Sequence, residues 1–337
     1  MRPRRLGLCL LLCCIWFGLA GCERSSGDHL VVYSAGPRPL IDAVVEQFES
    51  ETGHTVELYA ATTGQVMARL EAEKYRPRAD VVVLASQLAA HALKDQQRLL
   101  AYRPSNIDQT RKNWHDPDGF YHATGAAIVA MAVHEEAESP PDWEQAMAGD
   151  WPGRLIMPSP SRSGTAADFL ITQIVGSEED IWQRWHQARS HAGLDFAAAN
   201  SQAITSLAMR AHDGMLAAAD YLIYRQIAAG ASLAVHYPAD GSVLVSRPIV
   251  IMADTPRQDM AKAFVDHYFS EQVQQMVAAQ HLLPAHLQVA VSAERAGQEP
   301  PLLLSADPAE ALAAQIRILR RFQLEVERAQ VLEARSQ

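Results

Sequence analysis

The chain has 337 residues, with 39 acidic and 29 basic side chains and a formal net charge of −10. A chain of this length can bury a large hydrophobic core. The acidic excess and the absence of a basic stripe argue against nucleic acid as a partner, so only a local group of donors could hold an anion.

The first 22 residues are typical of an export signal. Three arginines precede an uncharged apolar segment over residues 6–19, and the sequence Leu-Ala-Gly leads into Cys22. This pattern predicts a secretory signal over residues 1–21, too short for a stable membrane span. Its ending resembles a bacterial lipobox, which implies cleavage before Cys22 and a lipid on that thiol; an ordinary signal peptide or a short anchor helix is the alternative. We therefore expect an exported domain held to a membrane surface through Cys22 and a polar tether over residues 22–29.

All four cysteines lie in that first segment, and its removal leaves 26 basic against 39 acidic side chains. The rest of the chain therefore has no disulfide and no cysteine metal site. Thirteen histidines occur, but none at the His-x-x-x-His or His-x-His spacing that favours a zinc site. Neither Gly-x-Ser-x-Gly nor Ser-x-x-Lys occurs. These absences argue against a serine hydrolase or a penicillin-binding enzyme.

Three short apolar runs, each followed by a helical pattern, predict buried strands over residues 30–33, 56–59 and 81–84. Alternation of such strands with helices is typical of a parallel sheet covered on both faces. Ligands bind beyond the carboxyl ends of these strands. The loops at these ends supply hydroxyls and one arginine: Ser34, Arg38, Thr62, Thr63 and Ser86.

The same alternation continues in the second half of the chain. Strands are expected over residues 126–133, 155–157, 196–199, 215–219, 233–237 and 243–252. Helices are expected over residues 259–279 and 306–334 from their apolar periodicity. The strand over 126–133 would leave a first domain, and the strand over 243–252 would return to it.

The sequence Ser163-Gly164-Thr165 follows the strand over residues 155–157 and opens a helix. Ser163 or Thr165 can cap this helix, and Gly164 lets the backbone approach another group closely. The unpaired N–H groups and the positive dipole end of a helix start attract anions. Alone, the motif is more typical of a plain helix cap. Its place beyond a strand, opposite other hydroxyl-bearing loops, indicates one half of an anion clamp.

An ordered series of short motifs runs from about residue 30 to residue 284. The motifs are Val31–Ala35, Phe48–Val56, Ala79–Val82, Pro141–Trp143 with Trp151–Leu155, Ser163–Thr165, Tyr237–Gly241 and Ala261–Asp266. This series resembles the type-2 periplasmic substrate-binding proteins of ABC importers. The resemblance is to the group that binds ferric iron, thiamine, phosphonates and hexose phosphates.

The resemblance implies an α/β fold of two lobes, each a mainly parallel sheet with helices on both faces, with the ligand cleft between them. It also implies hinge closure on a ligand, delivery to an ABC permease in the inner membrane, and a periplasmic or cell-surface location. We expect a monomer that is not an enzyme and has no cofactor. Lobe 1 is expected over residues 30–128 and 248–300, lobe 2 over 129–247, and a C-terminal helical extension over 301–337.

Iron binders of this group use two adjacent tyrosines, a histidine in the first loop and often an acid after the third strand. Here Leu222 follows Tyr221, Arg38 stands in the first loop and Ser86 follows the third strand. Ferric iron prefers several anionic oxygens, whereas a guanidinium suits phosphate, phosphonate or carboxylate. We therefore expect a small anionic ligand, with Asp220 as partner for an ammonium or hydroxyl group on it. The expected ligand-binding residues are Ser34, Arg38, Thr62, Thr63, Ser86, Ser163, Gly164, Thr165, Asp220 and Tyr221.

Two alternatives stay open. The first is ferric iron with a synergistic anion, bound by the phenolates of Tyr221 and Tyr224 if Tyr224 turns into the cleft. The second is an exported enzyme or signalling receptor on the same fold. Arg247, next to the returning strand, either reaches the hinge side of the cleft or, as we favour from the sequence, is solvated.

Overall fold

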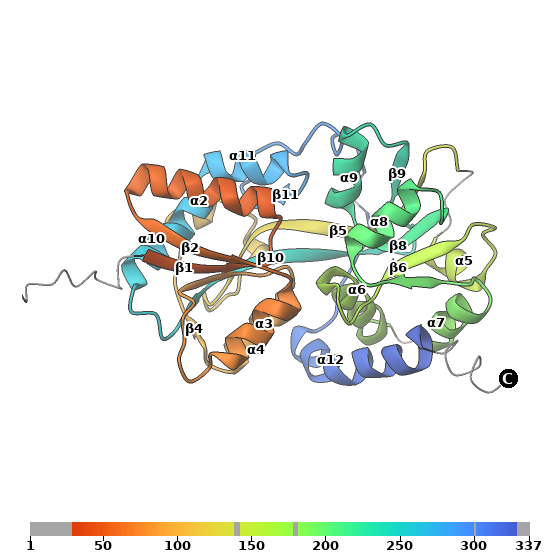
Figure 1. Ribbon diagram of the computed structural model, residues 1–337, viewed down its shortest axis with the longest axis horizontal. Helices are drawn as coiled ribbons and strands as arrows, with labels where there is room; N and C mark the ends of the chain where they lie inside the picture. Colours follow the sequence, from red (N-terminus) through yellow and green to blue (C-terminus); the bar gives the residue numbers. More distant parts are fainter. Residues whose placement is uncertain (1–28, 138–141, 178–180, 300, 329–337) are drawn as a thin grey trace, which may run out of the picture.

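The structure is a computed structural model that describes residues 29–137, 142–177, 181–299 and 301–328. The predicted signal peptide and Cys22 lie outside these residues. The described elements form two halves, joined by two long strands (Figure 1). We call the half that holds the first strands lobe 1 and the other half lobe 2. Among the described residues, no helix is long and apolar enough to cross a membrane.

Lobe 1 is a sheet between two helical layers. Its strands are β1 (His29–Ser34), β2 (Thr55–Ala60), β3 (Val81–Val83) and β4 (Leu99–Leu100). Its helices are α2 (Arg38–Thr52), α3 (Thr63–Ala72), α4 (Gln87–Asp95), α10 (Gln258–Tyr268) and α11 (Glu271–Ala279). In Figure 1, α2 and α11 lie above the sheet, and α3 and α4 lie below it. The short helices η1 (Ile107–Gln109) and η2 (Lys112–Trp114) follow β4.

The side chains of β1 point alternately to the two helical layers of lobe 1. This strand runs parallel to β2 and β3, with Tyr33 beside Tyr59 and Val82. Leu30 and Val32 belong to the core cluster that includes α2, α10 and α11, whereas Val31 and Tyr33 pack with α3 and α4. Successive side chains of a strand point to opposite faces, so this apolar run serves both layers.

The single helix predicted over residues 259–279 is wrong. The chain forms α10 and α11 instead, with a break at Phe269 and Ser270. The Ser270 hydroxyl accepts the N–H of Val273 at 3.3 Å and starts α11. A serine that caps a helix start in this way ends the preceding helix locally.

Lobe 2 has the same architecture. Its strands are β6 (Leu155–Pro158), β7 (Asp195–Ala197), β8 (Gly214–Ala219) and β9 (Leu233–His236). Its helices are α5 (Trp143–Ala148), α6 (Gly164–Val175), α7 (Ile181–Ser190), α8 (Asn200–Ala208) and α9 (Asp220–Ala228). β6 pairs in parallel with both β7 and β8. In each of the pairs β6–α6, β7–α8 and β8–α9, the helix follows its strand, so the three helix starts share one edge of the sheet.

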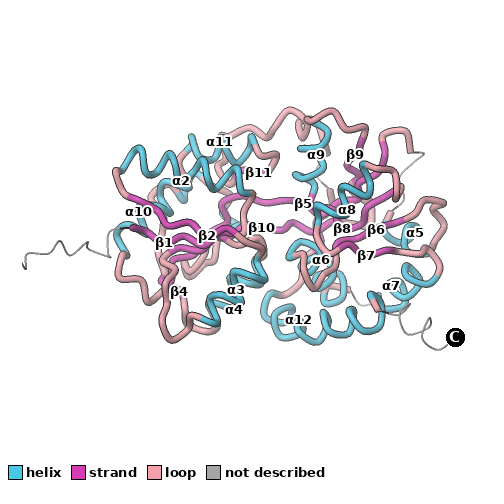
Figure 2. The backbone as a smooth tube through the Cα atoms, in the orientation of Figure 1, coloured by secondary structure: helices cyan, strands magenta, loops and turns pink. Residues whose placement is uncertain are grey.

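The long strands β5 (His122–His134) and β10 (Ser242–Met252) connect the lobes (Figure 2). They pair with each other in antiparallel fashion, and the sheet order is β2-β1-β3-β10-β5-β8-β6-β7. β11 (Leu283–Pro284) pairs with β5, and β12 (Leu303–Leu304) pairs with β10. The domain boundaries expected from the sequence, at residues 128/129 and 247/248, fall inside these two connecting strands.

The helix α12 (Pro308–Phe322) is part of the core of lobe 2. Phe322 is fully buried, and its ring lies 5.1 Å from that of Trp185 in α7. The same core cluster contains Leu88 of α4, so α12 packs with side chains from both lobes. After α12 the chain winds more widely over Gln323–Glu327. Within the described residues, the α-helix predicted over residues 306–334 covers only Pro308–Phe322. The described chain starts in lobe 1 with β1 and ends in lobe 2 beyond α12 (Figure 1).

Candidate functional site

The carboxyl ends of the parallel strands of both lobes meet around Gly164. A Cβ atom added to Gly164 would lie 3.3 Å from the carbonyl oxygen of Ala85, 3.7 Å from Oγ1 of Thr63 and 3.8 Å from Cβ of Ser86. Thr63 and Ser86 lie at the starts of α3 and α4 in lobe 1. The structure therefore brings three of the expected residues together across the two lobes.

The start of α6 has unused donors. The Ser163 hydroxyl accepts the N–H of Ala166 at 3.3 Å and the side-chain amide of Asn200 at 3.2 Å. Within the part of the chain that the structure describes, the N–H groups of Gly164 and Thr165 donate no hydrogen bond. Two free N–H groups at a helix start are suited to an anionic oxygen. Ser163 is thus a helix cap, as the plain reading of the motif predicts, and it leaves the helix start available.

Asp168, one turn into α6, joins the two lobes directly. Its Oδ1 accepts the hydroxyl of Ser86 at 2.8 Å, and the carboxylate also accepts the N–H of Gln87 at the start of α4. Complete burial raises the pKa of the Asp168 carboxyl to about 7, although both hydrogen bonds act to lower it. The sequence places Asp168 beside the motif, but only the contact between lobes reveals its role.

Asp220 lies fully buried at the start of α9. Its carboxylate accepts Nη1 of Arg295 at 2.7 Å, the hydroxyl of Tyr237 at 2.8 Å and the N–H of Tyr221 at 2.7 Å. The protein itself thus supplies three donors to this carboxylate. In this conformation, Asp220 has little capacity left for the ammonium or hydroxyl group that the sequence suggests.

Tyr224 is only 1 % exposed and lies in the interior of lobe 2. Its hydroxyl is 3.1 Å from that of Tyr237. Burial raises the pKa of Tyr224, which disfavours the phenolate that ferric iron requires. Among the described residues, no group of three or more histidine, cysteine, aspartate or glutamate side chains is placed to hold a metal ion.

The remaining expected residues have local partners. Ser34 is buried and accepts the N–H of Gly36 at 3.1 Å. Thr62 caps α3 in a reciprocal arrangement with Gln65, and Oγ1 of Thr63 accepts the N–H of Ala85 at 3.3 Å. The contact of Thr63 with Ala85 ties together two of the loops that face lobe 2.

Two arginines have the opposite placement from the one that the sequence suggests. The side chain of Arg38 is 64 % exposed and donates to Asp42, four residues further along α2. Arg247 is 4 % exposed, so the expectation that it is solvated is wrong. Its guanidinium carbon lies 4.8 Å from the centre of the Tyr221 ring. Its burial depends on the pairing of β10 with β5, which no local pattern around Arg247 indicates.

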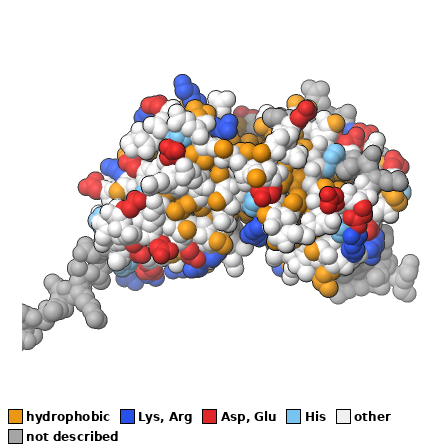
Figure 3. Space-filling model, turned by 90° about the horizontal axis from the view of Figure 1, so that it is seen from above, with side chains coloured by type: hydrophobic (Ala, Val, Ile, Leu, Met, Phe, Trp, Pro, Cys, Tyr) orange, Lys and Arg blue, Asp and Glu red, His pale blue; other side chains and the backbone are white. Residues whose placement is uncertain are grey.

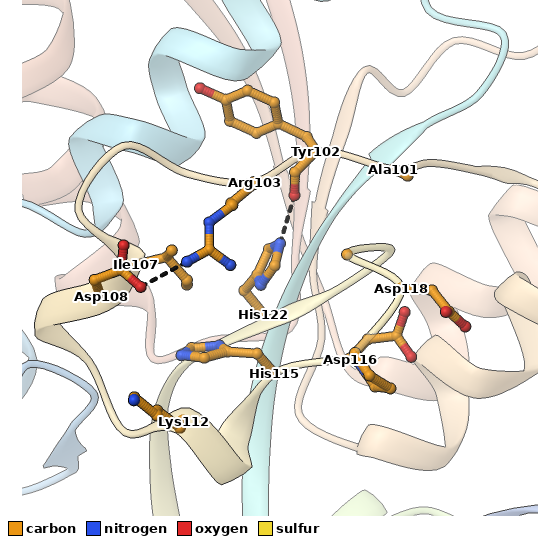
Figure 4. A pocket seen from close by; sticks show the side chains of 12 residues that line it. Ala101, Tyr102, Arg103, Ile107, Asp108, Lys112, His115, Asp116, Asp118 and His122 are labelled. Carbon is orange, nitrogen blue, oxygen red and sulfur yellow. Dashed lines mark hydrogen bonds and ion pairs between the residues drawn. The ribbon is translucent and has the colours of Figure 1, made fainter.

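Hydrophobic side chains gather on the face over the junction of the lobes, while charged side chains are more frequent away from it (Figure 3). A cavity of about 680 Å³ lies elsewhere, in lobe 1, and contains none of the expected residues. Figure 4 shows Arg103 paired with Asp108, and Nε2 of His122 bonded to the carbonyl of Tyr102 beside His115. These basic groups already have partners in the protein, so the cavity is a weaker candidate than the junction.

Residues 30–282 match the family described as bacterial extracellular solute-binding protein. A periplasmic-binding protein of a probable ABC transporter, y4fP of Sinorhizobium fredii, is 27 % identical over 267 residues, which is 75 % of this chain and 72 % of that protein. The fold is similar to that of AfuA from Actinobacillus pleuropneumoniae with fructose-6-phosphate bound, at a TM-score of 0.79 and 18 % identity over 90 % of this chain and 99 % of that one. It is also similar to iron-bound HitA from Pseudomonas aeruginosa, at a TM-score of 0.74 and 16 % identity over 86 % and 99 %.

The chain therefore belongs to the family of bacterial extracellular solute-binding proteins. The expected family and the two-lobed periplasmic binding protein fold are confirmed. This family binds and delivers solutes. The solved structures of similar fold include both a sugar-phosphate complex and an iron complex, so they do not select one ligand class.

Proposed function

We propose that this protein is the substrate-binding component of an ABC importer and captures a small anionic ligand, an organophosphate or phosphonate, between its lobes. It then delivers the ligand to a permease in the inner membrane. The family match and the relative that is named as a periplasmic-binding protein of an ABC transporter support the transport role. The protein has no catalytic step in this proposal.

The free start of α6 is the observation that carries the anionic ligand. Among the residues that the structure describes, the N–H groups of Gly164 and Thr165 have no acceptor. A Cβ atom added to Gly164 would lie within contact distance of Ala85, Thr63 and Ser86 in lobe 1. An anion beside this helix start would meet N–H donors from lobe 2 and the hydroxyl of Thr63 from lobe 1, whereas the Ser86 hydroxyl donates to Asp168. Binding that uses donors from both lobes favours the closed arrangement over an open one, which is how a ligand drives hinge closure.

Ferric iron is the second candidate, because HitA and other structures of this fold bind it. The site offers little to this cation. Tyr224 is buried with a raised pKa, Asp220 is paired with Arg295, and the Arg247 guanidinium lies against Tyr221. A ferric ion prefers several anionic oxygens, and a nearby guanidinium repels it.

The predicted lipid on Cys22 is part of the same proposal. A lipidated cysteine followed by a short polar tether would keep a monomeric binding protein close to its permease in the periplasm or at the cell surface. An acyl chain supplies membrane affinity without a spanning helix. The expected net charge of −13 after signal removal is no obstacle, because the ligand donors are local.

Isothermal titration calorimetry on the processed protein tests the ligand class. The probes are fructose 6-phosphate, an alkylphosphonate, thiamine phosphate, inorganic phosphate and ferric citrate. The proposal expects one-to-one binding of at least one phosphate ester or phosphonate and no turnover of it. Tight binding of ferric iron alone, with a coloured complex, would contradict the anionic ligand and leave the iron candidate.

A further inference from the structure

Two arginines stack on two tyrosines of α9, and among the described residues only one of these arginines has a counter-ion. Arg295 lies over Tyr224 and Arg247 lies over Tyr221, each with its guanidinium carbon 4.8 Å from the ring centre. Both arginines are at most 5 % exposed. The two sites thus offer the same kind of aromatic surface to the same kind of cation.

The difference lies in the acceptors. Arg295 donates to the Asp220 carboxylate at 2.7 Å and to the carbonyl oxygen of His281 at 2.8 Å. Within the described residues, Arg247 forms no ion pair, and its Nε is buried without a hydrogen-bond acceptor. Asp220, which precedes Tyr221 in α9, is already used by Arg295.

An unpaired buried guanidinium is costly. A guanidinium keeps its charge at physiological pH and cannot escape the cost by losing a proton. Burial of such a charge costs more free energy than stacking on one tyrosine returns. An anion from outside the chain would offset the remainder, and two parallel N–H···O bonds to a phosphoryl or phosphonyl group would satisfy the guanidinium.

Ser246 and Arg247 are held by α4 of lobe 1 and by the connecting strand β5. The Ser246 hydroxyl donates to Oε1 of Gln87 at the start of α4, at 3.1 Å. The carbonyl oxygen of Arg247 accepts the hydroxyl of Thr124 in β5 at 3.0 Å. The register between β10 and β5 shifts between Ser246 and Pro248, at the position of Arg247. Such irregularities re-aim a side chain and are frequent beside binding sites.

We propose that Arg247, stacked on Tyr221, is the counter-ion of the bound ligand and pairs with a phosphoryl or phosphonyl group on it. This inference rests on the proposed function and adds the residue that selects the ligand charge. It assigns to Arg247 the role that the sequence suggests for Arg38. It also gives Tyr221 a role that does not involve iron, because the Tyr221 ring supports the Arg247 guanidinium.

The test compares Arg247→Met with Arg295→Met. Methionine keeps the length of the side chain and removes its charge. The first substitution removes a charge without a partner, so the melting temperature of the ligand-free protein is expected to stay the same or rise. The second leaves the Asp220 carboxylate buried and unpaired, so the melting temperature is expected to fall. A purely structural role for Arg247 predicts a fall for both variants.

Binding provides the second readout. Arg247→Met is expected to weaken binding of the phosphate ester or phosphonate probe by about 100-fold or more, because a charge-assisted bidentate contact is lost. Arg247→Lys keeps the charge but cannot form two parallel hydrogen bonds, so its affinity for the probe is expected to be about tenfold lower than that of the wild type. Arg38→Gln is the control and is expected to leave the dissociation constant unchanged.

The outcomes separate this inference from the proposed function. Unchanged binding in Arg247→Met, with binding in the wild type, would overturn the inference and leave the proposed function intact. If the wild type bound only ferric citrate or no probe, the proposed function would fail. In that case a lower melting temperature of ligand-free Arg247→Met would overturn the inference as well, and an unchanged or higher one would support an unidentified anionic partner.

Discussion

Asp168→Asn should remove a pH dependence from ligand binding. In the structure the Asp168 carboxyl is buried between Ser86 and Gln87 of lobe 1, with its pKa raised to about 7. When the lobes part, the carboxyl meets water and its pKa returns toward the ordinary value of 3.8. The closed form therefore holds a proton more tightly than the open form. Protonation of Asp168 therefore favours closure fully at pH values below the pKa of the open form. This contribution decreases as pH rises and is lost above the pKa of the closed form.

The size of the effect follows from the two pKa values. They differ by about three pH units, so the wild-type affinity can fall by at most about a thousandfold between pH 4 and 7, about 4 kcal/mol. The slope approaches about tenfold per pH unit within this window and is zero above it. The amide side chain of the variant cannot lose a proton, and its oxygen can still accept a hydrogen bond from the Ser86 hydroxyl.

Calorimetric titrations of both proteins with one ligand, from pH 4.5 to 8.5, measure this effect. A phosphate ester has its own ionisation near pH 6, so the ratio of the two dissociation constants at each pH is the quantity to compare. The dissociation constant of the wild type, divided by that of the variant, should increase as pH rises to about 7 and stay constant above it. Asp259→Asn, which changes an exposed carboxyl of α10, is the control. A constant ratio over the whole range would refute the reasoning.

Four further predictions use single substitutions. Gly164→Ala places a methyl group 3.3 Å from the Ala85 carbonyl oxygen and should weaken ligand binding about tenfold by calorimetry, with little change in urea stability. Arg38→Gln changes an exposed pair with its own helix and should alter neither the dissociation constant nor the melting temperature by a measurable amount. Phe322→Ala empties a fully buried position and should lower the free energy of unfolding in urea by about 3–5 kcal/mol; a loss below about 1 kcal/mol would show that α12 is not part of the core. Cys22→Ser should release the protein from the membrane fraction of cells, and continued attachment would contradict the predicted lipid.

The sequence predicts the architecture well because the architecture depends on local patterns. The apolar runs over residues 30–33 and 155–157 correspond to β1 and β6, and Ser163 does cap α6. Period-two and period-3.6 patterns report which side chains are buried, and buried strands followed by helices allow few topologies. The helix break at Ser270 is missed because apolar residues continue on both sides of it.

The site is predicted less completely because its charges are balanced by residues that are distant in the chain. Asp220 is suggested as a ligand contact, but its partner Arg295 lies 75 residues further on, beyond the segment that matches the family. Arg247 is buried through the pairing of β10 with β5, whereas Arg38 finds Asp42 one turn away. The sequence shows which charged side chains exist, but the tertiary structure determines which of them are paired within the protein and which can still bind a ligand.

The described chain starts in lobe 1 and ends in lobe 2, and this placement makes closure measurable without touching the site. Donor and acceptor fluorophores, one at the start of β1 and one on α7, would lie on different lobes (Figure 1). Energy transfer between them would change when the lobes rotate about β5 and β10. A protein labelled in this way would report its own ligand in solution as an optical sensor, including ligands that produce little heat on binding.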